Sequence, residues 1–154
     1  MCGKWQIKEK KYGDLYQEHI LEQYKLYVEF ADRISQRRAD ANTFFLTINT
    51  LIVTGLGLLN NSVGRYSIVI AILGSVLSIT WYFILKSYRM LNSGKFKVIH
   101  EIEEHLPMAL YKHEWEILGG GKDKTKYWPI SHIEKIVPLV FVLAYITLAV
   151  ITNI

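Results

Sequence analysis

This 154-residue chain is poor in cysteine, and two long stretches of it hold no acidic residue. Its one cysteine, Cys2, cannot form an intramolecular disulfide, which excludes a small disulfide-stabilised secreted domain. Cys2 also lies too early to follow a signal peptide, and Gly3 does not occupy the position that N-myristoylation requires. The first 40 residues carry repeated charges and no apolar core of a cleavable signal sequence. We therefore expect a later apolar segment to direct targeting.

The missing charges define three apolar runs. All 14 acidic residues fall in two blocks, seven within residues 9–40 and seven within residues 101–134. The runs 41–59, 67–85 and 136–152 contain no charged residue. A charge at the bilayer centre costs ~2.5–3.5 kcal/mol on the mildest scale, and a spanning helix needs ~20 apolar residues. The pattern predicts three transmembrane helices rather than the alternative, three buried helices of a soluble core.

The predicted fold class is an all-α integral membrane protein whose first two spans form a hairpin with long cytoplasmic helical extensions. Four parts follow along the chain: a cytoplasmic amphipathic helix (1–40), the two-span hairpin (41–85), a cytoplasmic helical segment and loop (86–130), and a third transmembrane helix (131–154). Residues 60–64 form the polar turn of the hairpin. Ser131 and Glu134 form an S-x-x-E pattern, which predicts a capping box at the start of the third helix.

The basic residues predict the orientation. Eight Lys and Arg residues precede the first run, Arg65 lies in the turn, nine fall between the second and third runs, and none follows. Basic residues stay on the cytoplasmic side of a membrane. We therefore expect a protein of the bacterial inner membrane with its N-terminus in the cytoplasm and its C-terminus outside.

The N-terminal segment has the periodicity of one long amphipathic helix starting at Asp14. No proline or glycine separates Ile34 from Leu51, so this helix should continue into the first span. Its apolar face predicts a homo-oligomer interface, and the alternative is packing against the other cytoplasmic helices of the same chain. The candidate interface residues are Tyr16, Ile20, Tyr24, Tyr27 and Ile34.

Hydroxyl groups recur along one side of the first span at spacings of four, three and four. A polar stripe of this kind could line a pore between subunits, because conduction needs polar groups that replace hydration without holding ions tightly. Thr and Asn side chains also hold membrane helices together, and that packing role remains the alternative. The candidate pore-lining residues are Thr43, Thr47, Thr50, Thr54 and Asn49.

Basic side chains lie just inside the first two spans, where they could bind lipid headgroups or an anionic cytoplasmic ligand. The alternative is that they only set the topology. The candidates are Arg33, Arg37, Arg38, Lys86 and Arg89.

Catalytic and metal-binding patterns are weak. His100 and His105 are five residues apart, whereas H-E-x-x-H places its histidines four apart on one helix face. Residues 119–125 (GGGKDKT) lack the spacing of a phosphate-binding loop. We therefore expect no enzyme activity, cofactor, metal site or nucleic-acid partner.

Three phrases carry a family resemblance: YKLYVEFADRISQRRADANTFFLTINT, WYFILKSYRMLNSGKFKVIHEIEEHLPMALYKHEWEILGGGK and SHIEKIVPLVF. They resemble the RipA-like octameric membrane proteins of bacteria, which implies a homo-oligomeric inner-membrane protein, an octamer by this resemblance, with no catalytic residues to carry over. A looser similarity is to SLATT effectors of anti-phage defence, which are thought to open pores in response to a nucleotide signal or infection. The third span departs from that second plan.

These observations together favour a homo-oligomeric ion channel or pore-forming effector in the lipid bilayer, gated through its cytoplasmic helices by a nucleotide signal or a protein partner. The alternative is a non-conducting scaffold or regulator that recruits envelope or signalling partners through residues 101–118.

Overall fold

The computed structural model describes residues 7, 9–59, 66–123 and 125–151. Cys2, the predicted turn at 60–64, Arg65 and the end of the third apolar run lie outside the described residues. Every described element is helical, and no strand occurs among them. The elements are α1 (Glu9–Tyr12), α2 (Tyr16–Leu59), α3 (Ser67–Glu103), α4 (Leu110–Ile117), the 3-10 turn η1 (Gly119–Gly121), α5 (Ile130–Glu134) and α6 (Ile136–Ile151).

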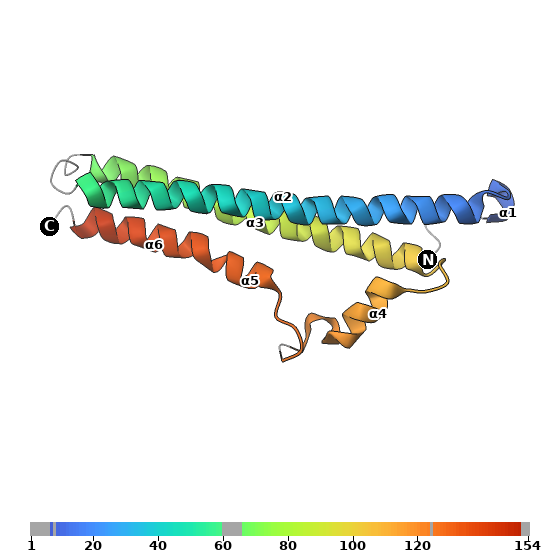
Figure 1. Ribbon diagram of the computed structural model, residues 1–154. Helices are drawn as coiled ribbons and strands as arrows, with labels where there is room; N and C mark the ends of the chain where they lie inside the picture. The colour runs from blue at the N-terminus through green and yellow to red at the C-terminus, as the bar shows by residue number, and fades with distance from the viewer. Residues whose placement is uncertain (1–6, 8, 60–65, 124, 152–154) are drawn as a thin grey trace.

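Two long helices form the body of the molecule (Figure 1). The 44 residues of α2 and the 37 residues of α3 run antiparallel as a hairpin. At 1.5 Å per residue they measure about 66 and 55 Å, well beyond the ~30 Å hydrocarbon core of a bilayer. The expected unbroken helix from the N-terminal segment through Leu51 is confirmed.

Helix α3 is central, because α2 packs along one side of it and α6 along another (Figure 1). We call the end built from residues 41–59, 67–85 and α6 the apolar half, and the end built from residues 16–40 and 86–103 the polar half. Among the described residues, α3 is long and apolar enough to cross a membrane, and α6 is a shorter apolar helix of 16 residues.

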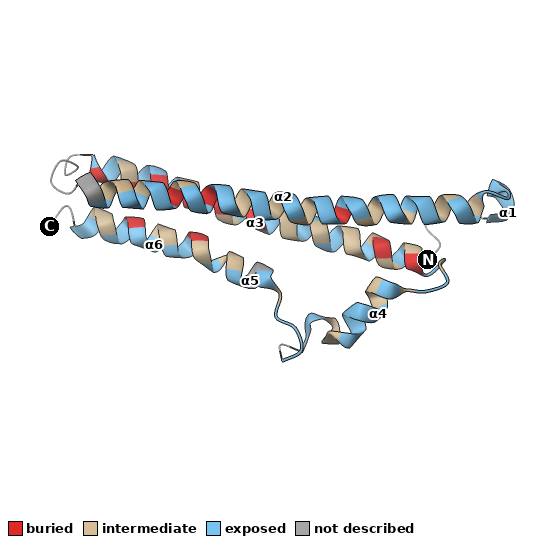
Figure 2. Cartoon of the chain, in the orientation of Figure 1, coloured by how far each residue is buried: buried red, intermediate tan, exposed pale blue. Residues whose placement is uncertain are grey.

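The core of the apolar half is aromatic. The indole ring of Trp81 is fully buried and stacks on Phe45 at 6.1 Å and 10°. Phe141 of α6 approaches the same indole at 6.1 Å, so all three helices meet there. Leu85 completes the buried cluster. Most other apolar side chains of this half point outward and are exposed (Figure 2).

The third helix starts differently from the predicted capping box. Pro129, not Ser131, precedes the first helical residue of α5, and Lys135 separates α5 from α6. Glu134 is instead used in an ion pair with Arg38 of α2, at 3.5 Å. Pro138 falls in the first turn of α6, where a missing N–H is tolerated. A short helix and a break therefore replace the expected continuous third helix.

Candidate functional site

The four threonines of α2 all lie on the outer surface of the protomer. Thr43, Thr47, Thr50 and Thr54 are exposed. Phe45 and Asn49, on the same helix, are buried against the neighbouring helices. At 100° per residue, Thr47 lies about 200° around the helix from Phe45. The threonine stripe therefore faces away from α3 and α6, toward lipid or another subunit.

Asn49, the fifth pore-lining candidate, lies inside the protomer. Its side chain is fully buried, and its Nδ2 donates to the carbonyl of Phe45 at 2.8 Å. The hydroxyls of Ser78 and Tyr145 lie 2.9 and 3.1 Å from its Oδ1, which accepts from both. One polar residue from each of α2, α3 and α6 thus forms a closed network. Asn49 is therefore not on the surface where a pore between subunits would form. Its contacts match the alternative role, in which polar side chains hold the helices together.

Gly74 makes room for this polar network. The ring of Tyr145 lies directly on Gly74, and a Cβ built there would come within 2.3 Å of the tyrosine Cζ. The hydroxyl of Ser78 also lies 2.9 Å from the Gly74 carbonyl. The helix–helix contact between α3 and α6 thus depends on a residue without a side chain, as in other membrane helix interfaces.

The candidate interface residues of α2 form the seam between α2 and α3. Tyr24 donates to Glu103 of α3 at 3.0 Å, and the ring of Tyr27 lies 4.5 Å from the Lys95 ammonium. Tyr16, Ile20 and Ile34 are likewise only partly exposed. These contacts match the alternative to a subunit interface, in which this face of α2 packs against another helix of the same chain. The large apolar side chains left exposed in this part of α2 are Leu21, Leu26 and Phe30, and Leu15, just before the helix, is exposed as well.

The basic candidates separate into two groups. Arg33 pairs with Glu29 at 2.6 Å on the outer face of α2, and Arg37 is exposed. Arg38 instead points inward to Glu134. Their facing atoms, Nε and Oε2, are buried and have no hydrogen-bond partner, so the contact is electrostatic.

Lys86 and Arg89 of α3 lie near Lys135, at the break between α5 and α6. Burial lowers the pKa of Lys135, and the positive charges of Arg89 and Lys86 lower it further. Arg38, Lys86, Arg89 and Lys135 thus form a basic cluster where α2, α3 and α5 converge. Lys135 was not among the basic candidates predicted from the sequence, although it directly precedes the apolar run 136–152.

Glu103 is a buried charged residue that the sequence pattern did not single out. Its carboxylate is 1% exposed and accepts hydrogen bonds from the backbone N–H groups of Tyr111 at 2.8 Å and Lys112 at 3.0 Å. These are the second and third residues of α4, the positions that an N-cap side chain normally satisfies. Burial, then the bond to Glu103, raises the pKa of Tyr24 to about 12.

Glu103 therefore ties α2, α3 and α4 together. The sequence offered one signal: Glu103 follows Ile99 by four residues, so the two share a helix face. In the structure Ile99 is fully buried. The Glu103 carboxylate thereby caps the start of α4, which begins at Leu110. Its neighbour Glu104 pairs with Lys112 at 3.3 Å. No metal-binding group of three His, Cys, Asp or Glu side chains occurs among the residues that the structure describes.

A helical bundle with an apolar half, a helix long enough to cross a bilayer and outward-facing apolar side chains defines a helical membrane protein. The chain belongs to the octameric membrane protein family (8xMP), whose family model matches residues 21–154. The predicted family is confirmed, and its description as octameric supports self-association of this chain. Neither a curated protein nor a solved structure matches the chain significantly.

Proposed function

We propose that the protein is a homo-oligomeric pore of the bacterial inner membrane, lined by the threonine stripe of α2. The observation that supports this most directly is that Thr43, Thr47, Thr50 and Thr54 are all exposed on the face opposite the protomer core. A row of hydroxyls facing lipid has no obvious use, whereas the same row facing a neighbour can contact water or ions.

In this proposal α2, α3 and α6 are the three spans, with the polar half in the cytoplasm and the C-terminus outside. The basic cluster then lies at the level of the cytoplasmic lipid headgroups, where Lys and Arg attract anionic lipids. The 44-residue α2 extends well beyond the bilayer and connects the pore to the polar half. A signal that moves the polar half could therefore open or close the pore, as an effector in defence would require.

The test is ion flux through proteoliposomes containing the full-length protein, beside a Thr47→Leu/Thr50→Leu variant. We expect the original protein to conduct and the variant to conduct at least about tenfold less, because leucine replaces the groups that solvate the ion. Thr80→Leu is the matched control. Thr80 is an exposed threonine of α3 whose hydroxyl bonds to the Val76 carbonyl at 2.9 Å.

Size-exclusion chromatography must show the same oligomer for all three proteins. Flux that survives the double substitution in an intact oligomer would remove the stripe from the pore. An equal loss of ion flux in Thr80→Leu would mean that leucine substitution damages the protein in general, and would not support a pore-lining role for Thr47 and Thr50. Membrane depolarisation in cells that express the original protein, and not in cells with the double variant, extends the test to the bacterial membrane.

A second candidate function is a non-conducting scaffold, favoured by the exposed apolar side chains of the α4 region. Met108, Leu110, Trp115 and Ile117 are 70%, 60%, 41% and 60% exposed. Such side chains on a short segment outside the apolar half suit contact with a protein partner. Proximity labelling tests this function: a partner that is lost when Trp115 and Ile117 are changed to Ser, with no flux in the original protein, would favour the scaffold.

A further inference from the structure

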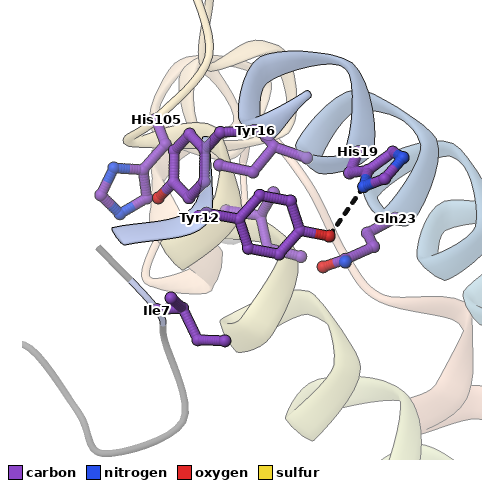
Figure 3. A pocket seen from close by; sticks show the side chains of 8 residues that line it. Ile7, Tyr12, Tyr16, His19, Gln23 and His105 are labelled. Carbon is purple, nitrogen blue, oxygen red and sulfur yellow. Dashed lines mark hydrogen bonds between the residues drawn. The ribbon is translucent and has the colours of Figure 1, made fainter. Parts of the chain in front are cut away.

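A small cavity lies at the tip of the polar half, where α1 folds back against α2 and the end of α3 (Figure 3). Gly13 makes the fold-back with φ of 101°, a backbone conformation that side chains rarely allow. Gln17 of α2 donates to Glu9 of α1 at 3.0 Å and fastens the two elements. The cavity has a volume of about 150 Å³ and is lined by Ile7, Tyr12, Tyr16, His19, Ile20, Gln23, Ile102 and His105.

The lining combines aromatic faces with neutral hydrogen-bonding groups. Four of the eight side chains are tyrosine or histidine rings, three are isoleucines and one is an amide. Tyr12 lies edge-on to Tyr16 at 5.8 Å and to His19 at 5.7 Å. Its hydroxyl is 2.7 Å from Nδ1 of His19, which fixes both rings, as Figure 3 shows. Among the described residues that line the cavity there is no Asp, Glu, Lys or Arg, and such a lining suits an uncharged ligand.

The cavity has room for a ligand of about one ring. A cavity of ~150 Å³ in another protein takes up benzene. Aromatic side chains bind a planar ring by stacking, and bases are held this way whatever their sequence. Gln23 and His105, both exposed at the cavity, can donate to and accept from the edge of such a ring.

We propose that this cavity is a binding site for a neutral, single-ring aromatic heterocycle with a hydrogen-bonding edge, of the pyrimidine-base type. The isoleucines and tyrosines contact the faces of the ring, and Gln23 and His105 bind its polar edge. Five of its lining residues precede the family-matched residues 21–154: Ile7, Tyr12, Tyr16, His19 and Ile20. Ring binding here does not depend on whether the protein conducts ions.

The test uses full-length protein in nanodiscs and ligand-observed NMR with uracil and cytosine as probes, and toluene as an apolar ring of similar size. Ile20→Trp fills the cavity, and Leu26→Trp places the same ring on an exposed part of α2 outside it. Gln23→Leu removes the amide at an exposed position and should leave the fold intact, as circular dichroism will verify.

We expect uracil or cytosine to bind the original protein and Leu26→Trp, and to lose binding to Ile20→Trp. Gln23→Leu should weaken base binding about tenfold, the usual loss when a hydrogen-bonding group is left unpaired, and leave toluene unaffected. Failure of both bases to bind the original protein would overturn the proposal. So would binding that survives Ile20→Trp, or toluene binding as tightly as the bases.

Discussion

The contact between Gly74 and Tyr145 shows how one small residue determines the packing of α3 against α6. The ring of Tyr145 occupies the space that the Cβ of any residue other than glycine would need at position 74. The same tyrosine supplies a hydroxyl to Asn49, so ring and hydroxyl are positioned together. In an apolar surrounding each hydrogen bond to a buried amide matters, so this contact constrains the tyrosine more than apolar packing alone would.

We expect Gly74→Ala to destabilise the protein by about 1–3 kcal/mol, because overfilling a packed contact forces the tyrosine out of place. Thermal unfolding in detergent, followed by circular dichroism, measures the change. Gly94→Ala is the matched control, since nothing lies within 4 Å of a Cβ at that helical position. Alanine there should be neutral or stabilising by about 0.5–1 kcal/mol. Equal destabilisation by both substitutions would contradict the packing role of Gly74.

Tyr24 predicts a pH dependence of stability. Its pKa rises from 10.0 in the unfolded chain to about 12 in the folded protein, through burial and then the bond to Glu103. The folded protein holds the proton more tightly, so this contribution is complete below pH 10 and is lost as the pH rises from 10 to about 12. An absorbance titration of tyrosinate should show a late step whose amplitude falls by about one tyrosine in Tyr24→Phe. A titration curve with the same late step in both proteins would contradict the assignment.

At the scale of the element, α4 depends on a residue outside it. Two of its first N–H groups bond to Glu103, which belongs to α3. A helix of eight residues is too short to be stable alone, so its order comes from this cap and from packing. The ring of Phe96 supports the same segment, with its centroid 5.6 Å from that of Tyr111.

We expect Glu103→Gln to loosen α4 by about 1–3 kcal/mol, because the amide NH₂ would face a backbone N–H and leave it unpaired. Hydrogen exchange of the Tyr111 and Lys112 amides should then speed up about tenfold or more. Glu104→Gln is the control: it removes an exposed ion pair to Lys112 that is worth ~1 kcal/mol or less. Similar exchange rates in the two variants would rule out the capping role.

The sequence predicted the elements better than their faces. The second apolar run was expected to start at Ser67, and α3 starts there. Periodicity shows that Tyr24 and Tyr27 share a face, but it cannot tell whether that face meets α3 or another subunit.

The side-chain networks could not be read from spacing. Asn49 bonds to Tyr145, 96 residues away, and the two meet only because α2 and α6 both pack against α3. Ser131 fitted a capping pattern, yet Glu134 pairs with Arg38 because α5 packs near α2. In each case a local rule competed with a tertiary contact, and the tertiary contact prevailed.

At the scale of the whole molecule, the distribution of charge and the helix lengths predict a definite topology. The apolar ends of α2, α3 and α6 lie side by side, and the polar half extends beyond them (Figure 1). Tyr66, 64% exposed before α3, belongs to the outside in the proposed orientation. Lys122, after η1, belongs to the cytoplasm.

We expect single cysteines at these two positions, in a Cys2→Ser background, to report opposite sides of the membrane. Tyr66→Cys should react with an impermeant maleimide added to intact spheroplasts, because its side chain faces the outside. Lys122→Cys should react only after permeabilisation. Labelling of Lys122→Cys in intact spheroplasts would reverse the proposed topology and remove the cytoplasmic assignment of the polar half.

The Asn49–Ser78–Tyr145 network also has a consequence for biosynthesis. During translation α2 and α3 are made first, and their asparagine and serine can pair with each other at 2.9 Å before α6 exists. Tyr145, near the end of the chain, then fills the space over Gly74 and supplies the last hydroxyl. A chain that stops before Tyr145 leaves a polar group and a groove open to lipid, and quality-control proteases can recognise such a surface. The packing of α2 against α3 is therefore covered on its third side only once α6 has been made.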